Sequence, residues 1–204
     1  MRIVIVALEY LEPEWLDTLK CIQETGLPYE IVSRDGVGNM SRAYNTILKT
    51  DKEADYYWFV SNVTFKPQMP YELAMACDRL GWGAIHPAMP GSDHRFQWPN
   101  GHEPKETPFI EWTAPMVNAE LFALHPLDEM LPYYYMDLDW CHRIKPNKVG
   151  VHHSQIIGHT YLRNKKEHPI GQLRKQLRNY WTPISQRHMI QKYGKDWQQK
   201  LWPK

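Results

Sequence analysis

The segment that most constrains the fold of this chain is its first one. Residues 2–8 read Arg-Ile-Val-Ile-Val-Ala-Leu, a nearly uninterrupted run of β-branched and aliphatic side chains. A strand that is apolar on both faces belongs inside a parallel sheet, where helices cover it from both sides. We therefore expect residues 2–8 to form a central strand of such a sheet.

Predicted helices and strands alternate after this segment. Helices are expected where apolar residues recur at helical spacing, and strands where β-branched and aromatic residues cluster. The predicted helices lie between Pro13 and Gly26 and at residues 42–49, 70–80, 119–124 and 137–144, and the predicted strands lie at residues 29–33, 56–61, 84–86, 109–117 and 149–157. This order predicts an α/β fold with an open, mostly parallel sheet and helices on both faces.

Two regions do not follow the alternation. Residues 87–108 contain five prolines and two glycines with little periodicity, so we expect a long surface loop, which in a compact domain is usually functional or mobile. After Gly158 the chain becomes basic, with helix candidates at residues 172–180 and 184–193. The sequence therefore predicts a body of residues 1–160 and a basic helical C-terminal extension of residues 161–204.

The extension carries a large excess of positive charge. Residues 160–204 hold eleven Lys and Arg against two Asp and Glu, a charge of +9, which leaves −8 for residues 1–159 of a chain with a net charge of +1. Such a tail can bind an anionic partner, such as a nucleotide diphosphate, a phosphorylated acceptor or nucleic acid. It can equally be a solvated amphipathic helix that leans on its own acidic body, and the sequence favours neither.

Composition excludes several classes of protein. A chain of 204 residues suits one domain, and 13% aromatic residues are too many for a disordered chain. The apolar runs are far shorter than a membrane span, and no basic segment precedes a cleavable apolar one. Three widely spaced cysteines fit neither a disulfide framework nor a zinc site. We expect a soluble protein of the cytoplasm.

Four segments place polar residues at predicted strand ends and helix starts. They are residues 8–10, 38–45, 57–67 and 135–143, the last followed by a strand and then by Gly158 and His159. In this order they resemble the motifs of GT-A fold glycosyltransferases, especially family 2 of the nucleotide-sugar-dependent enzymes. The resemblance covers about residues 2–163 and implies a minimal GT-A (Rossmann-like) catalytic domain.

The resemblance implies transfer of a sugar from a UDP- or GDP-linked donor to an acceptor hydroxyl, with inversion and with Mn²⁺ or Mg²⁺. Such a transfer places negative charge on the departing diphosphate and needs a base for the acceptor proton. The residues that it assigns to the donor nucleotide are Glu9, Tyr10, Asp35, Arg42, Asn62 and Arg163. Asp35 would pair with the base ring, and an ordinary Asp-Gly turn is its alternative.

The metal ligands that the resemblance implies are Asn62 and His159. Asn62 stands where the family has the last Asp of its D-x-D motif, and Val60 replaces the first. An amide oxygen can ligate Mg²⁺ or Mn²⁺ but lacks the charge that makes a carboxylate a strong ligand for a hard cation. The alternatives are a turn residue for Asn62 and a satisfied buried histidine for His159. The spacing of His86, His94 and His102 is no metal signature.

The catalytic residues that the resemblance implies are Asp137 and Asp139. Because they lie two residues apart, they cannot share one helical face and should have different roles. Asp137 matches the general base, whereas Asp139 would support the helix start or the acceptor sugar, with Glu111 and Asp139 as the nearest substitutes for the base. The alternative for Asp137 is a helix N-terminal acid favoured by the macrodipole. Arg143 should tie this segment down through a carboxylate, and Trp112 either lines the acceptor side or packs in the core.

Other functions stay open from the sequence. A non-catalytic protein with a degenerate GT-A fold, which binds a nucleotide, nucleic acid or a partner, would also lack carboxylates at Val60 and Asn62. A nucleotidyltransferase is disfavoured, because no G-x-G-x-(R/T) loop with a following Lys succeeds the first strand. The acceptor can be a saccharide, a lipid-linked sugar, a protein or modified nucleic acid.

Overall fold

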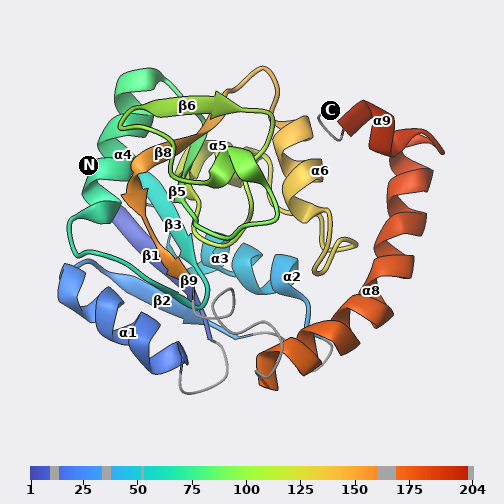
Figure 1. Cartoon of the computed structure of the whole chain (residues 1–204), viewed down its shortest axis with the longest axis horizontal. Coiled ribbons are helices and arrows are strands. Elements are labelled where there is room, and N and C mark those ends of the chain that lie inside the picture. The colour runs from blue at the N-terminus through green and yellow to red at the C-terminus, as the bar shows by residue number, and fades with distance from the viewer. Residues whose placement is uncertain (10–13, 34–37, 52, 160–168, 202–204) are drawn as a thin grey trace.

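A central β-sheet with helices on both faces forms the body of the protein (Figure 1). The computed structural model describes residues 1–9, 14–33, 38–51, 53–159 and 169–201. The strands are β1 (Ile3–Leu8), β2 (Tyr29–Val32), β3 (Tyr56–Val60), β4 (Val63–Thr64), β5 (Ala84–Ala88), β6 (Pro104–Thr107), β7 (Met116–Asn118), β8 (Val149–Ile156) and β9 (Gly158–His159). The helices are α1 (Glu14–Thr25), α2 (Met40–Asn45), α3 (Ile47–Thr50), α4 (Met69–Leu80), α5 (Ala119–Leu124), α6 (Met136–Arg143), α8 (Pro169–Tyr193) and α9 (Trp197–Leu201), with one 3-10 helix, η1 (Arg95–Gln97).

Both halves of the core are built on β1. Its six side chains are at most 2% exposed, and they alternate between two apolar clusters. Val4, Val6 and Leu8 belong to the cluster that contains residues of α2, α5 and α6. The other three residues of β1 belong to the cluster that contains residues of α1 and α4. The predicted central strand, covered on both faces, is therefore confirmed.

The main sheet has seven strands in the order β2-β1-β3-β7-β5-β8-β6. β1 pairs in parallel with β2 and β3, and β5 pairs in parallel with β8. β7 is antiparallel to both β3 and β5, and β6 is antiparallel to β8, so five of the seven strands share one direction. This confirms the predicted α/β fold with an open, mostly parallel sheet. A second sheet of two strands, β4 and β9, was not predicted.

Two predictions between residues 87 and 117 were wrong. The expected loop of residues 87–108 contains η1 and β6, and Gln97 within it is fully buried. The expected strand of residues 109–117 is reduced to β7, because Phe109, Ile110, Trp112 and Ala114 are all buried in irregular backbone. The apolar run therefore reflects packing into the core on several sides, not a pleated strand.

Helix boundaries follow local capping. Asn39 Oδ1 accepts a hydrogen bond from Arg42 N at 2.9 Å, so α2 begins at Met40, two residues before the predicted start. Gly81 ends α4 in the left-handed region at a φ of +62°, as glycine allows. The two helices predicted in the extension are one helix, α8, with Pro183 inside it, and α9 was not predicted. None of the described helices has the length and apolar character needed to cross a membrane.

Close packing at Gly150 yields a test of the sheet. A β-carbon at this position of β8 would lie 2.5 Å from the Lys105 carbonyl oxygen and would also overlap the Trp82 ring. Overpacking of this kind costs about 1–3 kcal/mol. We expect Gly150→Ala to lower the free energy of unfolding by that amount in urea denaturation. Ser154→Ala, at an exposed position of the same strand, should change it by less than about 0.5 kcal/mol, and equal stabilities of the two variants would contradict the packing described.

Candidate functional site

The carboxyl ends of β1, β2 and β3 lie at one edge of the sheet, where ligands bind in open α/β folds. Glu9 follows β1 and Ser33 follows β2, and Ser33 Oγ donates to Glu9 Oε2 at 2.7 Å. Asn62 follows β3 at the same edge. The structure thus brings together Glu9 and Asn62 of the predicted nucleotide residues. Three of the four other predicted residues, Tyr10, Asp35 and Arg163, lie outside the described residues.

Asn62 combines a left-handed backbone with a buried polar oxygen. Its φ is +53°, and its side chain is 2% exposed. Asparagine tolerates this backbone region better than most residues. Within the described part of the chain, Asn62 Oδ1 has no hydrogen-bond partner. Because an unsatisfied buried oxygen is costly, this atom is suited to a ligand, an ion or a water molecule.

The small sheet brings His159 next to Asn62. Val63 pairs with His159 across β4 and β9, so the two predicted metal ligands occupy neighbouring positions. His86 on β5 lies close enough to His159 for the two charges to interact, and burial lowers the pKa of His86 to about 4. Ala114 N donates to His86 Nε2 at 3.1 Å, which leaves His86 Nδ1 to donate to a main-chain carbonyl oxygen. His86 is therefore a neutral, hydrogen-bonded core histidine.

The described residues at this edge offer few ligands for a metal ion. Among the residues that the structure describes, no three His, Cys, Asp or Glu side chains are grouped closely enough to bind an ion. Asn62 and His159 offer one amide oxygen and one imidazole nitrogen, and neither atom carries a negative charge. The unsatisfied Asn62 oxygen fits a hard cation only if further ligands, such as diphosphate oxygens, complete the shell.

The polar residues of the segment 38–45 hold a neighbouring part of the protein. Asn45 Nδ2 donates to Leu127 O at 2.9 Å, and Leu127 N donates back to Asn45 Oδ1 at 3.0 Å. Ser41 Oγ donates to the main-chain oxygen of residue 131 at 2.6 Å. Arg42, predicted to reach the nucleotide, has its Nε 3.1 Å from Glu129 Oε2 at the surface. These contacts fix residues 127–131, which lead into α6.

The start of α6 carries the predicted base. Tyr135, directly before the helix, has a φ of +67°, a conformation that costs a bulky residue about 1–3 kcal/mol. Asp137 Oδ1 accepts from Leu138 N at 2.9 Å. Solvent reaches the Asp137 side chain, but protein atoms crowd around it, and burial raises its pKa to about 6, with a smaller contribution from the charge of Glu111. A carboxyl with this pKa can both accept and release a proton near neutral pH.

A polar cluster of four side chains, Ser92, His94, Gln97 and Glu111, lies beside Asp137. Ser92 Oγ donates to Glu111 Oε1 at 2.8 Å, and His94 Nε2 lies 3.7 Å from the same oxygen. With its amide oxygen turned toward Glu111 N, Gln97 accepts from that nitrogen at 2.9 Å and donates to Glu111 Oε1 at 3.3 Å. The charge of Glu111 raises the pKa of Asp137, and His94, when it is protonated, lowers it. This is a site with a carboxyl of raised pKa surrounded by fixed polar groups.

Asp139 has a different environment from Asp137. Its side chain is fully buried, and Arg143 Nε donates to Oδ2 at 2.8 Å. Tyr193 OH donates to Oδ1 at 2.7 Å, and Lys192 Nζ lies 2.6 Å from that oxygen. These contacts favour support of the helix, one of the two roles expected for Asp139, and they include the predicted tie through Arg143.

Comparison with known proteins finds similarity in structure alone. No family model and no curated protein matches this sequence. A197 from STIV matches with a TM-score of 0.54 and 15% identity over 74% of this chain and 81% of that one. S. aureus TarS 1–349 in complex with UDP matches with a TM-score of 0.52 and 12% identity over 100% of this chain and 76% of that one. GalNAc-T7 with UDP, GalNAc and Mn²⁺ matches with a TM-score of 0.58 and 9% identity over 98% of this chain and 54% of that one.

The fold is GT-A-like. Glycosyltransferases are among these structural neighbours. At such low identity the comparison describes the architecture of the chain, and the roles of individual residues depend on the geometry above.

Sequence reasoning missed part of the polar cluster of the GT-A-like domain. It assigned no role to His94, and it did not consider Ser92 or Gln97, because all three lie in a segment that reads as an irregular loop. Glu111 was considered only as a substitute base. Trp112, one of whose alternatives was the acceptor side, is 3% exposed and packs against Trp140 with ring centroids 4.9 Å apart, so it is a core residue.

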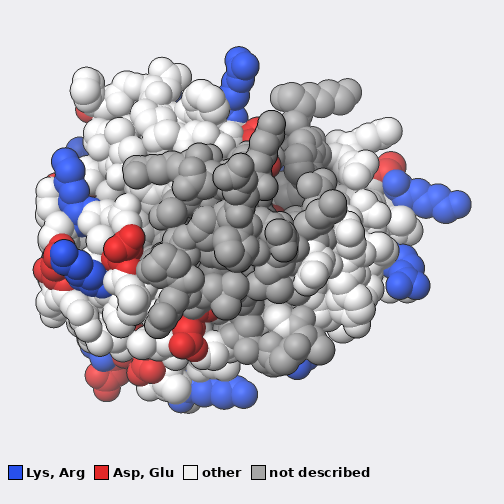
Figure 2. Space-filling model, turned by 60° about the horizontal axis from the view of Figure 1, so that its bottom comes forward, with Lys and Arg blue, Asp and Glu red and all other residues white. Residues whose placement is uncertain are grey.

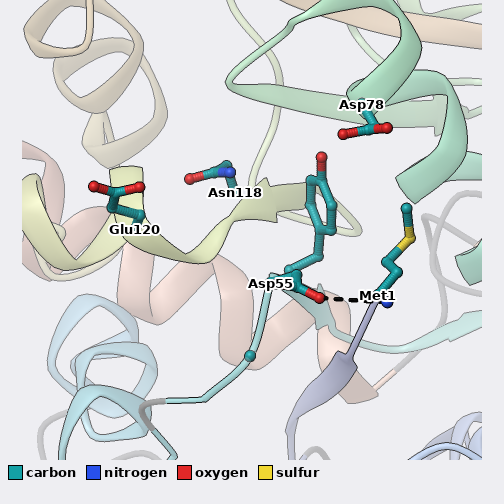
Figure 3. Close-up of a pocket in the computed structure, with 7 residues that line it drawn as sticks. Met1, Asp55, Asp78, Asn118 and Glu120 are labelled. Atoms are coloured by element: carbon teal, nitrogen blue, oxygen red, sulfur yellow. Dashed lines mark ion pairs between the residues drawn. The ribbon is translucent and has the colours of Figure 1, made fainter.

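A separate hollow of about 510 Å³ lies at the opposite edge of the GT-A-like sheet. Figure 3 shows the carboxylates of Asp55, Asp78 and Glu120 around it, together with Asn118 and Met1. Asp55 and Met1 precede β3 and β1, so this hollow is at the amino ends of those strands. It is therefore away from the polar cluster and from Asn62, and we assign it no role in the site.

The second half of α8 and α9 pack on α6 and on the segment before it. Trp197 is buried and stacks edge-on against Tyr135 with centroids 4.8 Å apart. His188 Nε2 and Lys192 Nζ lie 2.9 and 2.8 Å from Asp128 Oδ2. α8 follows the flank of the molecule in Figure 1, and the described Lys and Arg side chains on the face in Figure 2 stand apart from one another around its margin. These contacts favour the alternative in which the basic extension leans on its own acidic body.

The contacts of Asp139 predict a large effect on stability. Asp139→Ala would leave Arg143 and Tyr193 without their buried acceptor, whereas Lys192 keeps its pair with Asp128, and loss of such a hydrogen-bond partner costs about 1–3 kcal/mol. We expect that loss in the free energy of unfolding by urea denaturation. Asp196→Asn, which removes an exposed pair with Lys200 at 2.9 Å, should cost less than about 0.5 kcal/mol. A small effect of Asp139→Ala would mean that the pairing does not hold α8 on α6.

Proposed function

We propose that this protein transfers a sugar from a nucleoside diphosphate donor to an acceptor hydroxyl, with inversion. The observation that carries the proposal is Asp137, whose pKa burial raises to about 6 at the start of α6. A general base works best when its pKa lies near the working pH. The crystal structures of TarS with UDP and with UDP-GlcNAc, and of GalNAc-T7 with UDP, GalNAc and Mn²⁺, support a nucleotide-linked donor.

We propose that donor binding and proton removal take place in two different parts of the site. Glu9 and Asn62 lie at the ends of β1 and β3, and they are proposed to bind the donor with Tyr10, Asp35, Arg42 and Arg163. Asp137 removes the proton of the acceptor hydroxyl while that oxygen attacks the sugar from the side opposite the diphosphate. Asp139 holds α6 in place from within the protein. Whether the extension also binds an anionic acceptor or nucleic acid stays a prediction.

A divalent cation, Mn²⁺ or Mg²⁺, is part of the proposal. When bound, it would neutralise charge on the departing diphosphate. Asn62 Oδ1, buried and without a hydrogen-bond partner in the described residues, and His159 beside it would be its protein ligands. Because both ligands are neutral, the cation should bind well only together with the nucleotide.

The role of Asp137 is tested by Asp137→Asn. The amide cannot accept the acceptor proton, so we expect kcat to fall by roughly 10² to 10⁴, with the Kd for UDP nearly unchanged. The measurement is transfer from a panel of UDP- and GDP-sugars to saccharide acceptors, with the Kd from titration calorimetry. Asp17→Asn, at an exposed position of α1, is the matched control and should keep wild-type turnover. Near-wild-type turnover in Asp137→Asn would remove this residue as the base.

The same panel separates the enzyme from the alternative function. A protein that binds UDP or GDP tightly and yet releases and transfers no sugar from any donor would be the non-catalytic binding protein. If the wild-type protein neither binds UDP nor transfers sugar, the assignment of the strand ends to a nucleotide is overturned instead.

The cation is tested by titrating UDP in Mn²⁺ and in EDTA. We expect Mn²⁺ to tighten UDP binding and UDP to tighten Mn²⁺ binding by the same factor, as linkage requires. Asn62→Gly keeps the left-handed backbone, removes the ligand oxygen and should abolish most of this coupling. Asn62→Asp should tighten Mn²⁺ binding even without nucleotide, because it adds a charged ligand. Equal UDP affinities in Mn²⁺ and EDTA would favour a metal-independent reaction that relies on Arg163, Lys165 and Lys166.

A further inference from the structure

A second carboxylate stands beside the proposed base. Glu111 lies in the irregular segment before β7, and α6 packs against this segment. The main-chain amide of Ile110 points at the Cys141 sulfur. Cys141 follows Asp137 by four residues, so both side chains project from the same face of α6. Helix geometry therefore places Asp137 one turn from the Ile110 contact, beside Glu111.

Glu111 is held in a fixed position. Its side chain is 20% exposed, and Ser92 Oγ donates to Oε1 at 2.8 Å. Gln97 contacts both the main-chain nitrogen and the carboxylate of Glu111, at 2.9 and 3.3 Å. Neutral donors on a carboxylate keep it ionised and restrict its rotamer. A negative charge therefore has a defined place next to α6.

Aromatic rings hold His94, the neighbour of Glu111, in place. Phe96 and Phe109 pack on the His94 ring with centroids 5.5 and 4.8 Å from it. The described charged or titratable groups that interact with Asp137 include Glu111, His94 and, one helical turn further on, the Cys141 thiol. Burial lowers the pKa of His94, so this ring is mostly neutral at pH 7 and does not cancel the charge of Glu111.

We propose that Glu111 is a positioning residue that acts through Asp137: fixed by Ser92 and Gln97, its charge makes Asp137 a stronger base. The inference rests on the proposed function. In the step concerned, the acceptor oxygen bonds to the sugar carbon as the bond to the diphosphate breaks, and the acceptor proton moves to an Asp137 oxygen. A neighbouring negative charge favours arrival of that proton. Glu111 itself touches neither substrate in this account.

The test measures the proton affinity of Asp137 without turnover. Carboxyl ¹³C shifts of the full chain are titrated by NMR, with Asp137→Asn to assign the Asp137 signal. We expect Glu111→Gln to lower the Asp137 pKa by about one unit, because a like charge is removed. Glu106→Gln is the matched control, since Glu106 pairs with Lys148 at 2.8 Å on the exposed edge strand and should leave Asp137 unchanged. Should Glu111→Gln fail to fold, Glu111→Asp should give a smaller shift in the same direction.

Turnover provides a second measurement. Asp137 must be ionised to act, so kcat in the wild type should rise with pH through the pKa of about 6. In Glu111→Gln this rise should move to lower pH by the NMR shift, the kcat plateau should fall, and the KM for the donor should stay unchanged. An unchanged Asp137 titration in both Glu111 variants overturns the inference. A shifted titration in a protein that transfers no sugar would support the coupling and overturn the proposed function instead.

Discussion

The complete burial of β1 determines where this protein can place polar chemistry. Because its side chains alternate between two apolar clusters, neither face of the sheet is open to a ligand at this strand. Polar groups are therefore confined to the strand ends and to the segments that cover them. Asn62 and Tyr135, the non-glycine residues with positive φ among those described, both lie in this zone. Strained backbone is expected at such positions, where the surrounding structure fixes side chains for binding or catalysis.

The segment 38–45 illustrates how polar residues can act by supporting the structure. Asn45 and Ser41 form hydrogen bonds with residues 127–131, which precede Tyr135 and α6 in the chain. The segment thus links the carboxyl-end edge of the sheet to the helix that bears Asp137. Its polar residues act by fixing the chain that leads into α6.

Much of the fold could be predicted from the sequence, and the failures share a physical cause. β1, α4, α5 and α6 have regular apolar periodicity and clear end signals, such as Gly81, and they lie where local patterns place them. β6, β7 and β9 are two to four residues long, and their partners are distant in sequence. Local hydrophobic periodicity therefore does not predict them. The residues of the site likewise differ in whether the sequence alone could identify them. Asp137 could be found from a resemblance, whereas Ser92 and His94 become neighbours of Glu111 only through tertiary folding.

The burial of the Asp139 carboxylate also affects the order in which parts of the chain fold during synthesis. Its partner Tyr193 is 54 residues further along. At about 5–20 residues per second, a ribosome takes roughly 3–10 s to bridge that distance. Until then the carboxylate lacks the Lys192 and Tyr193 contacts that stabilise it in the finished protein. α6 can therefore settle into its final packing only after synthesis has passed residue 193, so a truncated product would carry Asp137 on an incompletely anchored helix.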